Sequence, residues 1–379
     1  GTTTVWGGGW KLFDEIDFEV RGWVPFSGWP IGLRDLEPYY DRAALLVGGS
    51  RVEDFKIDTF RKKFINKQRI IETQAIHSTF LRLLPRDSLD FGKKFRDVFE
   101  NSRTLRVLYN ANVVRLVINN GSSEVAGASI RTLSGRTYFL RAKRFILACG
   151  GIENARLLLF SNVGNDYDQV GRYYMDHPKS AGGTIIPAKN LDLSLYWKPQ
   201  DMGGLVIAGL QLSPELQKNK QVMNSYVQLR PWYVPDNRLM GAVRIFTNQG
   251  ILFRIFRKIF KFKMRVKELR LRNYIEQAPS PDNRVLLSHS RDIFGNPIAR
   301  ISWSVSKSDI NGLRVLHEML KQELERLDIG TFSSPLLDYR QGAMDITAAS
   351  HHMGTTRLGN VPKTSVVDRN CAVHGVPNL

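Results

Sequence analysis

The sequence predicts a mixed α/β fold, and three of its features carry that prediction. A short apolar segment at 144–151 runs through two glycines into a helix at 152–161, which is a strand–turn–helix arrangement. Residues 182–305 hold several predicted strands at hairpin-like spacing. A strongly periodic helix at 308–328 follows, with leucines on one face and Gly330 after its end. We therefore expect an α/β chain whose middle is mainly antiparallel sheet.

The other elements follow from local patterns. A Gly/Thr loop at 1–9 opens the chain, and a turn cluster at 25–30 precedes a helix that Asp35 caps, with Pro38 in its first turn. Alternating or continuous apolar residues predict strands at 106–109, 111–118, 125–132, 136–140, 182–186, 204–212, 223–229, 273–278, 284–288 and 299–305.

The length and composition indicate a globular protein of more than one domain. The chain has 379 residues, of which 42% are hydrophobic and 24% charged, and this excludes a disordered, collagenous or coiled-coil protein. No uncharged apolar stretch of about 18 residues is present, so we expect no membrane-spanning helix. Changes of pattern near Pro178 and Gly342 separate 1–178 plus 342–379 from an inserted domain at 179–341.

The positive charge is concentrated in one segment. The formal net charge is +18, and residues 254–272 contribute nine Lys or Arg against one Glu. Apolar residues recur there at alternating spacings of three and four, which predicts a basic amphipathic helix at 252–272. Such a helix could bind an anionic membrane surface, or it could cover a domain with its charged face in solvent. No nucleic-acid-binding motif is present, so no nucleic acid partner is expected.

The cysteines and histidines narrow the chemistry further. Cys149 and Cys371 can form neither a disulfide framework nor a metal site, and they favour a reducing, cytoplasmic location. Cys149, at the end of the strand predicted at 144–151, is expected to be a buried small hydrophobe. His351 and His352 precede a Gly-Thr loop with no metal-ligand spacing nearby, so no metal is expected. An imidazole at that place could serve as a base toward a hydroxyl, or it could be structural.

Several motifs occur in one order along the chain. They are GTTTVWGGG at the start, PFSGWPI with LEPYY, ILACGGIENARLLL, GRYYMDHP, and HHMGTTRLG followed by VVDRNCAVHGVPNL. Together they resemble the glucose-methanol-choline (GMC) family of FAD-dependent oxidoreductases, most closely its sugar- and polyol-oxidising branch. The resemblance implies a three-layer FAD-binding domain with an inserted antiparallel-sheet substrate domain.

The resemblance also implies roles for individual residues. His351, three residues before Gly354, matches the active-site histidine beside the flavin N5. The implied cofactor-binding residues are Gly1, Thr2, Val5, Trp6, Gly7, Gly8, Val113, Ala148, Cys149, Gly150, Asp368 and Asn378. His177, which also recurs near the cofactor in the family, is either a cofactor contact or part of the turn architecture.

Two departures from the family pattern affect what we expect of FAD attachment and of activity. Val5 stands where some members with covalent flavin have a histidine, so we expect non-covalent FAD. The family's GxGxxG fingerprint would precede Gly1, and its second active-site residue would follow Leu379. We therefore expect this chain to be a fragment that is inactive by itself.

The expected function is FAD-dependent oxidation of an alcohol group to a carbonyl. The alcohol would belong to a sugar or polyol, with hydride transfer to flavin N5 and His351 as proton acceptor. Two alternatives stay open, namely oxidation of a non-sugar alcohol and a membrane-surface binding protein that acts through 252–272. The sequence does not identify the electron acceptor.

Overall fold

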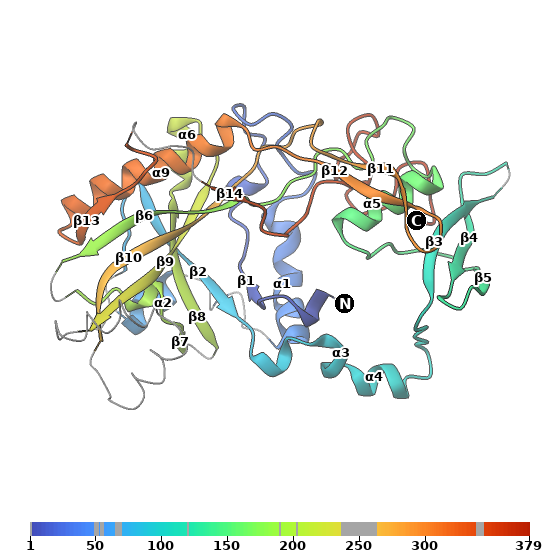
Figure 1. Cartoon of the computed structure of the whole chain (residues 1–379), viewed down its shortest axis with the longest axis horizontal. Helices are drawn as coiled ribbons and strands as arrows, with labels where there is room; N and C mark the ends of the chain where they lie inside the picture. Colours follow the sequence, from blue (N-terminus) through green and yellow to red (C-terminus); the bar gives the residue numbers. More distant parts are fainter. Residues whose placement is uncertain are drawn as a thin grey trace.

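The computed structural model describes residues 2–48, 53, 57–64, 70–119, 121–188, 191–201, 204–235, 264–338 and 345–379. In these ranges the strands form three sheets, of nine, three and two strands, in which all ladders between named strands are antiparallel. Figure 1 shows the large sheet at one end of the molecule and the three-stranded sheet at the other.

The nine-stranded sheet draws strands from most of the chain. Its path runs β1-β2-β8-β9-β10-β6-β13, with β7 beside β8 and β14 beside β6. The strands are β1 (Gly9–Trp10), β2 (Ile76–Leu83), β6 (Lys179–Pro187), β7 (Gln200–Asp201), β8 (Leu205–Leu212), β9 (Ser225–Pro235), β10 (Met264–Ile275), β13 (Gly330–Ser333) and β14 (Ile346–Thr347).

Helix α9 (Lys307–Arg326) covers one face of this sheet. Its leucines point into the main core, where Leu316, Leu320 and Leu324 are fully buried. The Ser306 hydroxyl accepts the Asp309 N–H, and the Asp309 carboxylate accepts the Ser306 N–H, which forms a capping box at the start of the helix. This confirms the helix predicted from the leucine period.

A second core forms where the three-stranded sheet, helix α5 (Gly151–Ser161) and the C-terminal segment meet. The sheet contains β3 (Asn112–Ile118), β4 (Val125–Arg131) and β5 (Thr137–Leu140), and a hairpin of β11 (Arg284–Arg291) and β12 (Pro297–Ser302) packs against α5. Val285 of this hairpin is fully buried beside Leu158 of α5 and the C-terminal valines.

Short helices connect these parts. They are α1 (Leu33–Val47), α2 (Ile57–Phe64), α3 (Phe91–Lys94), α4 (Arg96–Asn101) and α6 (Pro214–Lys220), with 3-10 turns at Thr2–Thr4, Glu15–Asp17, Arg86–Ser88 and Ser194–Tyr196. Helix α1 begins three residues earlier than predicted, because its N-cap is Gly32 and not Asp35. Asp35 lies in its first turn, and Pro38 lies further inside the helix. The Asp35 carboxylate accepts the Gly32 N–H at 2.8 Å.

The predicted fold class, an α/β chain with a large antiparallel sheet, is confirmed. The domain limits remain a prediction, and the elements cross them in both directions. β1 and β2, from the expected 1–178 part, complete the large sheet, whereas β11 and β12 lie within 179–341 and pack against α5.

The basic helix predicted at 252–272 is wrong over its second half. Residues 264–272 belong to strand β10, where Leu269 and Leu271 are buried and Arg270 between them is exposed. Pairing with both β9 and β6 stabilises this strand more than the helical period of its side chains could. Residues 252–263 lie outside the described part of the chain.

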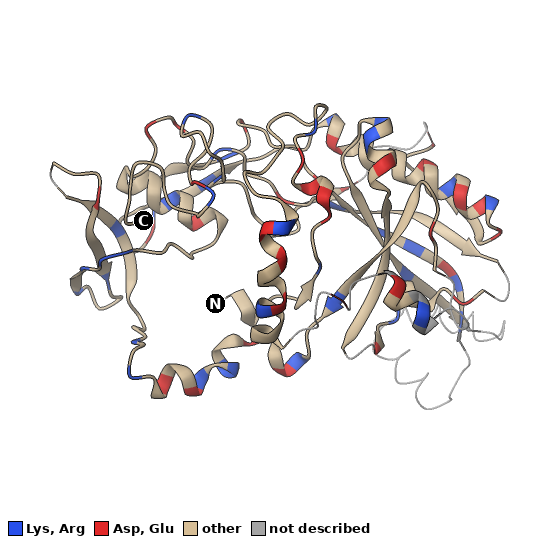
Figure 2. Cartoon of the chain, turned by 180° about the vertical axis from the view of Figure 1, so that it is seen from behind, with Lys and Arg blue, Asp and Glu red and all other residues tan. Residues whose placement is uncertain are grey.

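The remaining charge is mixed in sign. Figure 2 shows basic (blue) and acidic (red) residues interleaved along α1 and α9. Among the described residues, no helix is both long and apolar enough to cross a bilayer.

Two predicted strands are absent from the described structure. Residues 106–109 and 144–150 have no strand hydrogen bonding, and Ile146 is 90% exposed. A strand forms only beside a partner, and no described strand pairs with either segment. Cys149 is consequently exposed, so the prediction that it is a buried hydrophobe is wrong.

Candidate active site

Two segments that the sequence placed 174 residues apart form the centre of the candidate site. Met175 and Met353 exchange backbone hydrogen bonds of 2.9 and 3.0 Å, which brings Asp176 and His177 beside His351. Gly354 makes this approach possible, because it has φ +92° and an added Cβ would lie 1.9 Å from the Tyr173 carbonyl oxygen. A side chain at position 354 would therefore collide with the backbone of the Tyr173 segment and keep the two segments apart.

The Asp176 carboxylate fixes the backbone on both sides of the site. It is 3% exposed and accepts the N–H groups of His177 at 2.7 Å, Ala349 at 2.8 Å, Ser350 at 2.9 Å and His351 at 3.1 Å. Burial by itself would raise the pKa of Asp176, but these four donors outweigh burial and lower it. The carboxylate is therefore ionised at neutral pH.

This carboxylate also supports a strained backbone. Ser350 has φ +66°, which is unfavourable for a residue with a side chain. The Ser350 N–H bonds to Asp176, so the acceptor compensates for a conformation that aims His351 at His177.

The rings of His177 and His351 are in direct contact. Their centroids lie 4.5 Å apart, and His177 Nε2 hydrogen-bonds to His351 Nδ1. Burial lowers the pKa of His177, and charge on His351 lowers it further. His177 Nδ1 is buried and has no hydrogen-bond partner among the described residues. His351 is exposed, and its Nε2 is the nitrogen left for a ligand.

His352 points to different neighbours. Its ring stacks on Tyr174 at 5.5 Å, and its carbonyl oxygen lies against Gly151, where an added Cβ would approach it to 2.9 Å. Of the two adjacent histidines, His351 therefore has an exposed ring and His352 a ring packed on Tyr174.

Ala148, Cys149 and Gly150 lead into the N-terminus of α5 beside this loop. All three are exposed, no side chain caps the helix, and a Cβ on Gly150 would meet nothing within 4 Å. Thr355 donates its hydroxyl to the Gly151 carbonyl oxygen, which joins α5 to the histidine loop. Free helical N–H groups and bare backbone suit a phosphate or a flat ring.

The N-terminal loop supplies a second open surface. Trp6 donates its indole N–H to the Leu89 carbonyl oxygen at 2.8 Å, whereas Gly7 is open and a Cβ there would meet nothing within 4 Å. Gly8 is buried against Leu89 with φ +64°. Thr2 and Val5 are exposed, Val5 by 84%. Gly1 lies outside the described residues.

Three other predicted cofactor residues lie away from the histidines or are already bonded. Val113 is 40% exposed on β3. The Asp368 carboxylate accepts the N–H groups of Asn370 and Ala372, which closes a turn. The Asn378 amide bonds both backbone groups of Val125 at 2.9 Å. Asp368 thus stabilises its own turn, and Asn378 joins the C-terminal segment to β4.

These features fit the FAD that the resemblance implies. A dinucleotide or its substrate would find open backbone at Gly7 and Gly150 and unbonded N–H groups at the start of α5. It would also find a ring nitrogen without a partner, Nδ1 of His177. Within the described ranges, no three His, Cys, Asp or Glu residues gather as metal ligands.

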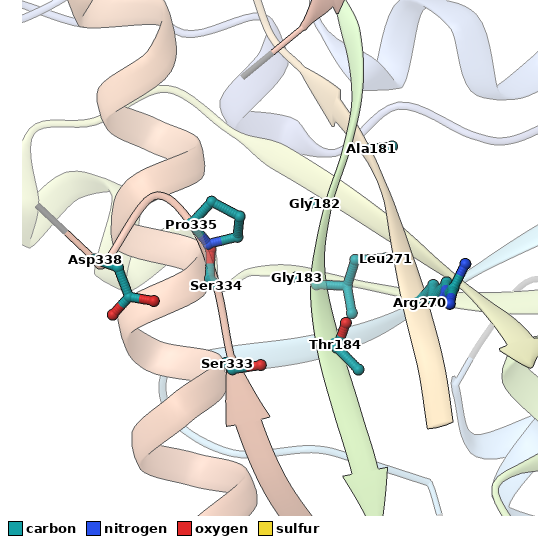
Figure 3. A pocket seen from close by; sticks show the side chains of 10 residues that line it. All are labelled: Ala181, Gly182, Gly183, Thr184, Arg270, Leu271, Ser333, Ser334, Pro335 and Asp338. Atoms are coloured by element: carbon teal, nitrogen blue, oxygen red, sulfur yellow. The ribbon is translucent and has the colours of Figure 1, made fainter. Parts of the chain in front are cut away.

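Two cavities of the described chain lie away from the histidines. One, of about 430 Å³, lies at the irregular β6 segment Ala181–Thr184, between β10 and the turn after β13 (Figure 3). The other, of about 440 Å³, lies beside β4 and includes Asn378. The histidine pair lies instead at the end of β10, with the His351 ring exposed and the His177 ring half-buried.

Sequence reasoning missed Asp176 and Tyr274. The ring of Tyr274 meets that of His177 edge-on at 5.4 Å. The Asp-His-Pro sequence could have indicated Asp176, since an acidic residue in a turn commonly accepts backbone N–H groups. Nothing local to Tyr274 indicated its position.

Comparison with protein families gives two matches with the description GMC oxidoreductase. The model of the N-terminal part matches residues 93–179, and the model of the C-terminal part matches residues 279–379. The second range includes the His351 loop, and the first ends just after His177.

Curated relatives are similar along the whole chain. Paromamine 6'-oxidase from Streptomyces fradiae is 25% identical over 100% of this chain and 72% of its own length. 2-Methyl-1,2-propanediol dehydrogenase from Mycolicibacterium austroafricanum is 23% identical over 100% of this chain and 74% of its own length.

A solved structure has the same fold. Formate oxidase from Aspergillus oryzae RIB40, described for its FAD modification, superposes with a TM-score of 0.54 at 15% identity. The superposition covers 100% of this chain and 77% of that one.

Proposed function

The chain belongs to the GMC oxidoreductase family and is an FAD-dependent alcohol oxidoreductase; from that premise we propose that it oxidises a sugar or polyol carbinol with His351 as proton acceptor. The observation that carries the proposal is the placement of His351, an exposed imidazole whose backbone the buried Asp176 carboxylate holds. A base needs both a fixed position and access to the hydroxyl.

The contact with His177 selects which nitrogen of His351 acts. Nδ1 of His351 is occupied by His177, so Nε2 receives the hydroxyl proton. Because burial keeps His177 neutral, its Nε2 can accept the His351 Nδ1–H, which leaves the His351 Nε2 lone pair free. The His177 contact therefore favours the tautomer that a base requires.

FAD, when bound, supplies the acceptor for the hydride of the carbinol carbon. The residues that would hold FAD are Trp6, Gly7 and the Ala148–Gly150 turn, which leads into α5. We propose that the attachment is non-covalent, because the exposed Val5 offers no nucleophile.

The substrate class rests on the relatives. The similarity to paromamine 6'-oxidase favours an alcohol group of a sugar as the substrate of this chain. The similarity to 2-methyl-1,2-propanediol dehydrogenase makes a small non-sugar diol the second candidate. Membrane binding through 252–272 loses its main support, because 264–272 is a strand.

The test is anaerobic mixing of the FAD-loaded enzyme with sugars, polyols and small diols. Bleaching of the flavin absorbance by a sugar supports the proposal. Bleaching by diols alone supports the second candidate, and no bleaching by any alcohol contradicts both. Acid precipitation of the same sample should leave the flavin in the supernatant, and flavin in the pellet would contradict non-covalent binding.

A further inference from the structure

One face of the β9–β10 ladder carries a row of aromatic and cationic side chains. The register pairs Tyr226 with Tyr274, Gln228 with Arg272, and Arg230 with Arg270. Paired residues share a face, and alternate residues repeat it, so these six side chains lie on one side of the sheet. Leu229 and Leu271, on the other side, are buried in the main core with α9.

This row begins at the candidate active site. The ring of Tyr274 contacts His177 at 5.4 Å, and His177 contacts His351. The Arg272 guanidinium lies 5.5 Å from the centre of the Tyr274 ring. Two contacts, of 5.4 and 5.5 Å, thus join His177 to Arg272 through the Tyr274 ring.

The row continues beyond Arg272 through a polar contact. Gln228 accepts from both the Tyr274 hydroxyl and Arg230, each at 3.4 Å. Arg230 is exposed and Arg272 is half-buried. The side chains therefore form one surface that leads from the histidines along the sheet.

Of the three arginines in this row, only Arg270 has an acidic partner in the described chain. Glu268 pairs with Arg270 at 2.8 Å, and Arg270 also stacks on Trp232 at 3.7 Å. Figure 3 shows the Arg270 side chain extending away from Asp338. Within the described ranges, neither Arg272 nor Arg230 has an ion pair with a carboxylate.

This arrangement is unfavourable for the fold alone. Arg230 stands directly opposite Arg270, a like-charge pair that destabilises a ladder, and the Glu268 carboxylate offsets this repulsion only on the Arg270 side. Guanidinium groups are the donors that best match carboxylate and phosphate oxygens. An aromatic ring at the near end suits the apolar face of a sugar.

We propose that the surface formed by Tyr274, Arg272, Gln228 and Arg230 binds an anionic group of the substrate, so that the enzyme oxidises acidic sugars. The inference rests on the proposed function, because it places the reacting carbinol at His351. The anionic group, a carboxylate or a phosphate ester, lies on Arg272 and Arg230, and the sugar ring between them packs on Tyr274.

The test compares matched neutral and anionic sugars. Anaerobic flavin reduction is measured with cellobiose against its uronic acid counterpart, and with glucose against glucose 6-phosphate. The variants are Arg272→Gln and Arg230→Gln, and the control is Arg136→Gln, at an exposed position of the β4–β5 hairpin. Titration calorimetry with glucuronate and with inorganic phosphate gives binding without turnover.

The proposal predicts that the wild-type enzyme prefers one anionic sugar over its neutral partner by about tenfold or more, and that added salt reduces the preference. Arg272→Gln removes most of this preference, and Arg136→Gln retains it. A preference confined to the uronic acid identifies a carboxylate site, and one confined to glucose 6-phosphate a phosphate site.

Equal rates for both members of each pair would overturn the proposal, as would an undiminished preference in both Arg272→Gln and Arg230→Gln. If no sugar reduces the flavin, the proposed function fails, and calorimetry still decides the anion site. Glucuronate or phosphate binding that weakens in Arg272→Gln supports the site, and binding unaffected by both variants overturns it.

Discussion

His177 hydrogen-bonds through Nε2 to Nδ1 of His351, with the two ring centroids 4.5 Å apart. Met175 and Met353 join the two segments through their backbones, and Asp176 holds the N–H of both histidines. His351, the proposed proton acceptor, is thus oriented by the segment that precedes β6.

Replacing His177 should slow flavin reduction without weakening substrate binding. His177→Phe keeps a ring but removes the acceptor for His351 Nδ1–H, and a lost hydrogen bond of about 1 kcal/mol corresponds to a rate about fivefold lower. His177→Gln retains an acceptor oxygen and should restore part of the rate. Stopped-flow reduction separates the rate from the substrate Kd. A Phe variant that reduces as fast as wild type would show that this contact has no part in the reaction.

Asp176→Asn should destabilise the fold and displace His351. An amide oxygen cannot accept all four N–H groups, and its NH₂ group would face donors. We expect a loss of about 2–4 kcal/mol in the free energy of unfolding at pH 7. The folded-state pKa is lowered, so this stabilisation is present above the unfolded pKa and disappears as the pH falls through the folded value. Urea denaturation of Asp176→Asn and of the exposed Asp282→Asn provides the measurement and its control. Equal stability of the two variants would be inconsistent with the assigned contacts.

Gly354→Ala should be far more costly than Gly375→Ala. Both glycines have a left-handed φ, +92° and +75°, so the conformational penalty is similar. A Cβ at 354 would overlap the Tyr173 carbonyl oxygen, whereas one at 375 meets nothing within 4 Å. Overpacking adds about 1–3 kcal/mol or more. Thermal unfolding of both variants measures the difference, and closely similar losses would contradict the tight approach of the two segments.

The buried His317 should make stability depend on acid pH. Its ring is fully buried between Ser334 and Asn273, and burial lowers its pKa to about 3. The unfolded chain takes up a proton below about pH 6.5 and the folded chain does not, so stability falls as the pH falls.

Between pH 7.5 and pH 5, the loss from this one group should be about 2 kcal/mol. Denaturation at both pH values should show a smaller loss in His317→Gln than in wild type. The exposed His289→Gln should keep the wild-type loss. A His317→Gln variant with an undiminished loss would assign the pH dependence to other groups.

The sequence was informative where one period dominated a whole element. The leucines of α9 and the nearly continuous apolar run of β8 each had a single interpretation. In 252–272, apolar residues at spacings of three and four fitted a helix. Leu269 and Leu271, at a spacing of two, also fitted a strand. The ladders with β9 and β6 decided between them, and those contacts depend on residues far along the chain.

The candidate site shows the same limit. The motif spacing distinguished His351 from His352, and the two rings do have different neighbours. The Tyr274 contact and the anchoring of the His351 loop by Asp176 arise only when distant segments pack together. The strand pattern at 144–150 likewise required a neighbouring strand that the described chain does not place there.

The most direct test of the central claim is the anaerobic rate of flavin reduction in His351→Ala and His352→Ala, measured by stopped flow with FAD bound. If His351 takes the hydroxyl proton, its replacement lowers the rate by about 10²–10⁴-fold. His352→Ala, which loses a ring stacked on Tyr174, should have a smaller effect on reduction and a larger one on stability or FAD retention. The reverse order would make His352 the acceptor, and unchanged rates in both variants would exclude this loop as the site of proton transfer.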